Sequence, residues 1–145
     1  PGPVALGEAV CQFEILLNAY PRGFHLITAE ILQSISTFPQ TGICHIFIQH
    51  TSAGIMINEN ADVDVRIDFE AWFDRAVKEN EPYYQHTIEG SDDMPAYIKS
   101  SLVGHCITIP IKNHRLYLGT WQGIFLCEFR NKASRRKLII TLIGE

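Results

Sequence analysis

The sequence lacks any long hydrophobic run, because its apolar stretches are only a few residues each. A helix needs roughly 20 consecutive apolar residues to cross a bilayer, so we expect no membrane-spanning segment and no membrane partner. Internal repeats and low-complexity segments are also absent. The 145 residues therefore predict one domain, residues 1–145, long enough to bury roughly two-thirds of the surface that the unfolded chain exposes.

Clustered positive charge is scarce. The 12 Lys and Arg residues against 16 Asp and Glu residues give a net charge of -4, and the basic residues are scattered apart from Arg135-Arg136-Lys137. A surface that binds duplex nucleic acid needs a basic patch, so we expect no nucleic-acid partner. Hydrophobic residues make up 46% of the chain and charged residues 19%, which is typical of a globular protein and argues against disorder.

Paired cysteines are missing as well. No C-x-x-C pair occurs, and the chain has no signal-like first segment. We therefore interpret the cysteines as reduced core residues of a cytoplasmic protein. They are widely spaced among apolar neighbours: Cys11, Cys44, Cys106 and Cys127.

The strands that the pattern predicts come in pairs. Residues 8–17 and 23–27 predict an opening hairpin, and residues 43–50 and 54–57 predict a second hairpin through Thr51-Ser52-Ala53. A short helix is expected between the pairs. It would begin at Thr28 as the cap and bury one side through Ile31, Leu32 and Ile35.

Two further helices are predicted. Between Asp62 and Asn80, apolar residues recur at the spacing of one helical face: Val65, Phe69, Trp72, Phe73 and Ala76. The next helix begins at a cap, Asp92 or Asp93, and ends at Gly104, with a predicted apolar stripe of Met94, Ile98 and Leu102. Three or four strands follow, and strands that arrive in pairs favour an antiparallel α+β sandwich.

A polar segment follows the apolar run of residues 43–48. His50 ends this predicted strand, so the backbone would hold its imidazole in place as a ligand or general base; a hydrogen bond that caps the strand end is the structural alternative. The acids Asp62 and Asp64 could be helix caps or metal ligands. Carboxylates at a helix start repel a bare phosphate, whereas bound Mg²⁺ or Zn²⁺ would reverse the local charge.

Two later segments could join this site. His86 and Glu89, at i and i+3, could point to one side if the chain turns at Gly90. In the run Gly119-Thr120-Trp121-Gln122-Gly123, the glycines let the backbone approach a ligand, and Trp121 offers a flat face for stacking on a heteroaromatic ring. A tight hairpin with a core tryptophan is the alternative interpretation.

These three segments together resemble the signature regions of the YjbQ-like family, the secondary thiamine-phosphate synthases. The similarity runs from about Arg22 to residue 145. It implies an α+β fold, a two-sheet β-sandwich of about seven strands with two or three helices, which packs as a homotrimer with the site near a subunit boundary. One position departs from the family: Tyr97 stands where a histidine is usual, and a tyrosine hydroxyl is a poor zinc ligand.

The resemblance also implies an activity and its residues. The reaction joins an aminopyrimidine diphosphate to a thiazole phosphate and releases diphosphate, so the partner is a small phosphorylated heterocyclic substrate. We expect His50, His86 and Glu89 to be catalytic, and the same three with Asp64 to hold Mg²⁺ or Zn²⁺. The alternatives are a metal-dependent hydrolase and a non-catalytic trimeric protein that binds a small molecule or metal. The expected substrate-binding residues are Asn58, Asn60, Lys99, Gly119, Thr120, Trp121 and Gln122.

Overall fold

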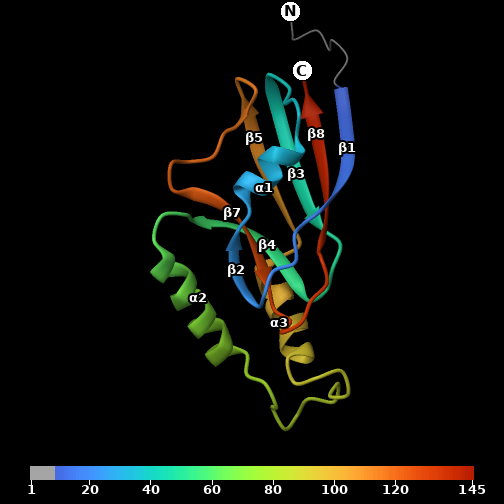
Figure 1. Ribbon diagram of the computed structural model, residues 1–145, viewed down its shortest axis with the longest axis vertical. Helices are drawn as coiled ribbons and strands as arrows, with labels where there is room; N and C mark the ends of the chain where they lie inside the picture. Colours follow the sequence, from blue (N-terminus) through green and yellow to red (C-terminus); the bar gives the residue numbers. More distant parts are fainter. Residues whose placement is uncertain (1–8) are drawn as a thin grey trace, which may run out of the picture.

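The computed structural model describes residues 9–145 and contains two antiparallel sheets packed as a sandwich (Figure 1). The larger sheet has the strand order β1-β8-β3-β5-β6, and the smaller has the order β2-β7-β4. The predicted α+β two-sheet sandwich is therefore confirmed. The elements are β1 (Ala9–Leu16), β2 (Gly23–Leu26), α1 (Thr28–Ser34), β3 (Thr41–Ile48), β4 (Ala53–Glu59), α2 (Val63–Ala76), α3 (Asp93–Val103), β5 (Cys106–Lys112), β6 (Arg115–Leu116), β7 (Gln122–Glu128) and β8 (Lys137–Gly144).

Both predicted hairpins are wrong. β1 pairs with β8 while β2 pairs with β7, and β3 pairs with β5 and β8 while β4 pairs with β7. Each short connection therefore carries the chain from one sheet to the other. The physical reason is burial: Ile46 of β3 and Ile55 of β4 belong to the same buried cluster, which forms because the two sheets pack face to face. Glu8, where we expected the first strand to begin, lies outside the described residues.

Helix α1 covers part of this core, and of the three predicted side chains Ile31 and Ile35 are buried whereas Leu32 is not. Ile31 is fully buried, whereas Leu32 is 42% exposed. Thr28 is not the cap, because Ile27 occupies that position. The Thr28 hydroxyl instead accepts a hydrogen bond from the amide of Ile124, at 2.9 Å, and so ties the helix to β7.

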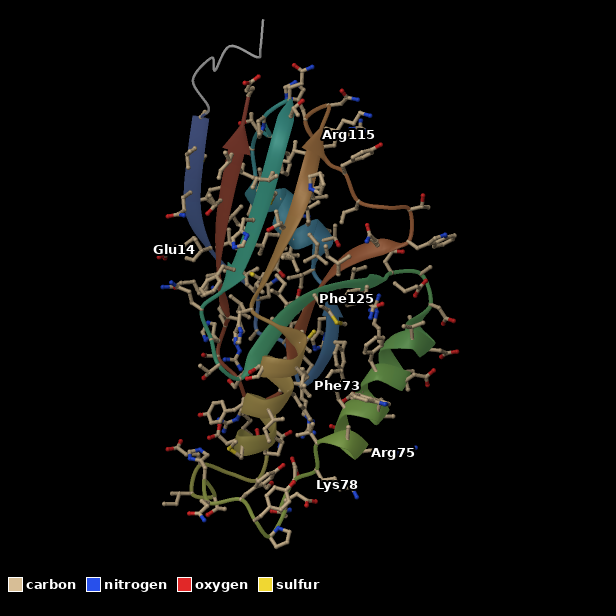
Figure 2. The ribbon with its side chains drawn as sticks, turned by 180° about the vertical axis from the view of Figure 1, so that it is seen from behind. Glu14, Phe73, Arg75, Lys78, Arg115 and Phe125 are labelled. Carbon is tan, nitrogen blue, oxygen red and sulfur yellow. The ribbon has the colours of Figure 1, made fainter. Side chains whose placement is uncertain are left out.

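Helix α2 begins as predicted and ends earlier. The Asp62 carboxylate accepts a hydrogen bond from the amide of Asp64, at 2.9 Å, which confirms it as the cap. Phe73 is 8% exposed and lies in the same buried cluster as Phe125 of β7, so this side of α2 packs against the smaller sheet (both residues are labelled in Figure 2). Trp72 is 60% exposed, so it lies outside the buried stripe in which we expected it.

Helix α3 buries a polar side, contrary to the prediction. Asp93 and Lys99 are 0% and 1% exposed, and Ser100 is 1% exposed, whereas Leu102 of the expected apolar stripe is 61% exposed. The stop at Gly104 is confirmed by a φ of 107°, a conformation that favours glycine. Ion pairs and hydrogen bonds, described below, therefore act beside the apolar contacts of Ala96 and Val103 on this helix.

The cysteines are all free thiols, as predicted, but they are not all in the core. Cys44 and Cys127 are buried, whereas Cys11 and Cys106 are exposed. Burial raises the pKa of the Cys44 thiol to about 11. Within residues 9–145, no helix has the length and apolar character needed to cross a membrane.

Candidate active site

The most distinctive pair of side chains is His86 with Asp93. The Nε2 atom of His86 lies 2.5 Å from Oδ2 of Asp93, and the Asp93 side chain is completely buried at the first turn of α3. The His86 side chain remains 43% exposed, so its other ring nitrogen can face a ligand. A buried carboxylate that holds one imidazole nitrogen fixes the tautomer and the orientation of the ring.

Arg130, just after β7, fixes the carboxylate of this pair. It makes an ion pair with Asp93 through Nη1 and another with Asp92 through Nε, at 2.9 Å. Its Nη2 donates to the backbone carbonyl of Glu89, at 3.1 Å. One guanidinium therefore joins β7, the start of α3 and the loop that carries His86.

The Asp92 carboxylate accepts hydrogen bonds from this network and does not cap α3. Its side chain makes no cap hydrogen bond. Oδ2 instead accepts from Arg130 and from the amide of Asn131, each at 2.9 Å. Although burial by itself raises the pKa of Asp92, the Asn131 amide and the Arg130 guanidinium outweigh it and hold that pKa below its ordinary value.

A hollow of about 320 Å³ opens beside His86. This volume is within the range of small-molecule pockets. The loop between α2 and α3 forms most of it, with one side chain from α3, Met94. The lining residues are Asn80, Glu81, Pro82, Tyr84, His86, Thr87, Gly90, Ser91 and Met94.

Tyr97 stands next to the histidine. The ring centroids of His86 and Tyr97 are 5.6 Å apart, with the planes tilted by 53°. Burial raises the pKa of the Tyr97 hydroxyl, and the neighbouring carboxylate of Asp93 raises it further. The tyrosine hydroxyl therefore stays neutral beside Asp93.

A second buried ion pair lies where β4, β7 and β8 meet. Arg136 donates to Glu128 through Nε at 2.7 Å and through Nη2 at 2.6 Å, and the two side chains are 8% and 1% exposed. Nη2 of Arg136 also donates to the hydroxyl of Ser52, at 2.9 Å. The amide of Arg130 donates to Oε2 of Glu128, at 3.1 Å, so this pair is continuous with the network around His86.

His50 lies beside this buried pair. Its Nε2 accepts a hydrogen bond from the amide of Lys137, at 2.9 Å, which occupies the lone pair that a metal would need. Burial lowers the pKa of His50, and the positive charge of Arg136 lowers it further. His50 is therefore a neutral acceptor that caps a strand end, and it is not among the residues that line the hollow at His86.

Lys99 is also committed to structure. We expected it at the margin of α3, but it is 1% exposed and makes an ion pair with Asp74 of α2 at 2.6 Å. Arg22 reaches the same oxygen of Asp74, also at 2.6 Å. The ammonium is therefore a link between two helices in the described chain.

The Gly119 to Gln122 segment lies at the start of β7 and does not line the hollow beside His86. The amide of Gly119 donates to Oε1 of Gln122 at 2.8 Å, and Asn60 donates to the carbonyl of Gln122 at 3.0 Å. Asn58 accepts from the amide that follows it, at 2.7 Å. β7 has 7 residues and therefore spans about 20 Å, with this segment at its start and Glu128 at its end. Within one chain, the third predicted segment therefore meets the Asn58–Asn60 part of the first segment, through the pairing of β4 with β7, and not the hollow beside His86.

Trp121 at this turn is 65% exposed. The alternative interpretation of a core tryptophan is therefore wrong, and one face of the indole is available to a ligand or to another chain.

The predicted metal ligands do not gather in one chain. Asp64 is in the first turn of α2, whose 14 residues span roughly 20 Å, and the loop with His86 and Glu89 follows the other end. Across residues 9–145, no three His, Cys, Asp or Glu side chains are grouped so that they could hold a metal ion. Of the four predicted ligands, His86 is the one whose imidazole keeps a nitrogen free of hydrogen bonds within the described residues.

Several residues of the network were not predicted from the sequence. Arg130, Glu128 and Arg136 were not singled out, because charged residues near a chain end are usually solvated. The strand of residues 122–128 did carry one signal: Glu128 ends an otherwise apolar run, and a buried carboxylate requires a cationic partner.

Comparison with known proteins agrees with this architecture. Residues 13–145 match the family described as UPF0047 protein YjbQ-like. The chain is 48% identical to the UPF0047 protein YjbQ of Salmonella typhimurium over 136 residues, which is 92% of this chain and 98% of that protein. It is 42% identical to the UPF0047 protein MJ1081 of Methanocaldococcus jannaschii over 82% of this chain and 83% of that protein.

Solved structures show the same fold. A YbjQ-like protein of unknown function from Sulfolobus solfataricus superposes with a TM-score of 0.81 at 24% identity, covering 96% of this chain and 100% of that chain. An uncharacterized conserved protein of the yjbq/upf0047 family from Clostridium acetobutylicum superposes with a TM-score of 0.70 at 34% identity, covering 92% and 98%. The chain therefore belongs to the UPF0047 family of YjbQ-like proteins.

Proposed function

We propose that the chain is an enzyme for a small heterocyclic substrate, in which His86, held by Asp93, moves a proton in the hollow beneath the α2–α3 loop. One observation carries the proposal: a completely buried carboxylate lies 2.5 Å from one nitrogen of a half-exposed imidazole at the wall of a hollow of about 320 Å³. General acids and bases are built in this way, with one ring nitrogen fixed and the other facing the substrate.

The reaction we assign is the one that the family resemblance implies, formation of thiamine phosphate. The thiazole ring nitrogen attacks the methylene carbon of the aminopyrimidine diphosphate, the bond from that carbon to oxygen breaks, and the diphosphate leaves with the electron pair. His86 in its protonated form donates a proton to the leaving diphosphate, while Asp93 stabilises the imidazolium. Glu89 lies on the same loop, where its carbonyl bonds Arg130, but its side chain is not among the residues that line the hollow.

The charges around the hollow set a condition on the substrate. Arg130 is paired with Asp92 and Asp93, and Lys99 with Asp74, so these cations are already neutralised. A diphosphate would therefore enter as its Mg²⁺ complex, since Mg²⁺ in proteins is commonly bound by few carboxylates together with substrate phosphates. The cation is then part of the substrate and needs no cage of protein ligands.

We include a homotrimer in the proposal. The outer face of the larger sheet carries an apolar row across β1, β8, β3 and β5, made of Val10, Ile143, Ile43 and Pro110 in register. Val10 is 66% exposed and Ile43 is 39% exposed, and in Figure 2 no helix of residues 9–145 crosses this face. A cyclic assembly sets different patches of neighbouring copies against each other. It could thus bring the exposed Trp121 of one copy to the His86 hollow of the next.

Production of thiamine phosphate from both precursors tests the proposal. With Mg²⁺ present, the wild-type protein should form product above the rate without protein, and His86→Gln should lose about 10²–10⁴-fold in rate, the usual contribution of a general acid or base. His105→Gln is the matched control, because the His105 side chain makes no hydrogen bond within the described residues, and it should keep the wild-type rate. Equal product from wild type and His86→Gln contradicts the proposal.

A second candidate, hydrolysis of a neutral ester or amide, is favoured by the same lack of unpaired cations at the hollow. Here His86 would remove a proton from water, and the substrate would carry no phosphate. A panel of uncharged aryl esters with the same two variants separates the candidates: ester hydrolysis that depends on His86, without thiamine phosphate, selects the hydrolase.

A further inference from the structure

A basic turn lies far from the proposed active site. Lys112 and Arg115 form a pair across β5 and β6, joined by Asn113 and His114, whose φ values are 53° and 62°. Two consecutive positive φ values define the tight hairpin turn that fixes the register of its flanking residues. The two basic side chains therefore extend from the same face of the hairpin.

These two positive charges have no acidic partner. Within residues 9–145, neither Lys112 nor Arg115 takes part in an ion pair. Glu145 approaches this end of the sheet, since its amide bonds the carbonyl of Thr41 at 3.0 Å, but it pairs with neither cation. Like charges directly opposite each other on two strands are destabilising, and a bound anion would remove that cost.

An aromatic side chain completes the turn. Tyr117 is 60% exposed, and Nζ of Lys112 lies 5.0 Å from the centre of its ring. The amide of Tyr117 donates to the carbonyl of Pro110, at 2.8 Å, which holds its backbone against β5. A hollow of about 430 Å³ opens here, lined by Lys112, Asn113, Arg115, Leu116 and Tyr117.

We propose that this hollow is a second binding site, for a small molecule that carries a phosphate on an aromatic base, as nucleoside monophosphates do. The phosphate lies between Lys112 and Arg115, where the guanidinium can donate two parallel hydrogen bonds. The base stacks on the exposed face of Tyr117. The Asn113 side chain adds an amide donor and acceptor at the rim.

This site is separate from the one at His86. Arg115 is at one end of the long axis of the molecule, and the α2–α3 loop is at the other (Figure 2). The two sites also differ in charge, because the cations near His86 are paired with carboxylates whereas those of the turn are unpaired. Binding at the turn is therefore independent of the proposed chemistry at His86.

Isothermal titration of the full chain with adenosine monophosphate, adenosine and inorganic phosphate tests this site at low ionic strength. Adenosine monophosphate should bind more tightly than either part alone, and added salt should weaken it. Arg115→Gln and Lys112→Gln should each weaken binding by about fivefold or more, because each removes a charge-assisted contact. Tyr117→Leu should bring the affinity for adenosine monophosphate down to that for phosphate.

Two control variants make the result specific. Lys132→Gln removes an exposed positive charge elsewhere and should leave the affinity unchanged, and so should His86→Gln, which separates this site from the active site. The proposal is overturned if adenosine monophosphate shows no saturable binding up to about 5 mM, because a weaker ligand is only marginally bound. It is also overturned if wild type and Arg115→Gln bind the nucleotide equally, or if adenosine binds as tightly as its monophosphate.

Discussion

Removing Arg136 should be among the most destabilising single changes in this chain. Its guanidinium makes two hydrogen bonds to Glu128 at 2.7 and 2.6 Å, and the two side chains are 8% and 1% exposed. Arg136→Met keeps most of the volume and leaves Glu128 buried without a cation. Breaking one side of a buried pair costs about 3–5 kcal/mol, a large part of the roughly 5–15 kcal/mol that stabilises a domain.

Urea unfolding at neutral pH and fixed protein concentration measures this effect. With a slope of about 2 kcal/mol per molar urea, a loss of about 4 kcal/mol lowers the midpoint by about 2 M. The double variant Arg136→Met with Glu128→Leu removes both charges and should recover at least half of the loss. Arg115→Met, on the exposed turn, should stay within about 0.5 kcal/mol of wild type. If Arg136→Met unfolds within about 1 kcal/mol of wild type, the argument from burial is refuted.

Three further predictions concern other parts of the molecule. Burial and Arg136 lower the pKa of His50 below its ordinary value of 6.5. The stability that neutral His50 contributes is therefore complete above about pH 6.5 and is lost as the pH falls toward the folded pKa. Between about pH 7 and pH 5, the free energy of unfolding should fall less in His50→Gln than in wild type. Gly144→Ala should prevent stable pairing of β8 with β3, because the added Cβ would lie 2.1 Å from the carbonyl oxygen of Thr41, and circular dichroism melting that matches wild type would contradict this. Trp121→Ala should change the free energy of unfolding of the isolated chain by less than about 0.5 kcal/mol, since the indole is 65% exposed, and a larger change would contradict that exposure.

The fold class could be predicted from the sequence, but the strand pairing could not. Alternating apolar residues located the strands, and Asp62 and Gly104 marked helix ends through local backbone chemistry. Pairing depends instead on contacts between residues far apart in sequence, such as Cys44 with Leu142. A short connection between two strands permits a hairpin without requiring one, and here burial between the sheets decided the pairing.

The candidate site was predicted in part. His86 was selected from its sequence neighbours, and the structure gives it a buried partner, Asp93, that we had considered only as a helix cap. Arg130 could not be found, because 37 residues separate it from Asp93 and only the fold brings them together. Lys99 and His50 were assigned to ligands, but in the described chain each has a structural partner. Whether they act in the reaction stays a prediction.

The polar buried side of α3 affects how temperature acts on the molecule. Exposure of apolar surface dominates the heat capacity of unfolding, and exposure of polar surface opposes it. Detaching α3, which releases Lys99 and Asp93, should therefore carry a much smaller heat-capacity change than separating the two sheets. Hydration of charged groups becomes less favourable as the temperature rises, so the buried ion pairs should hold this helix in place more strongly when the protein is warm than when it is cold.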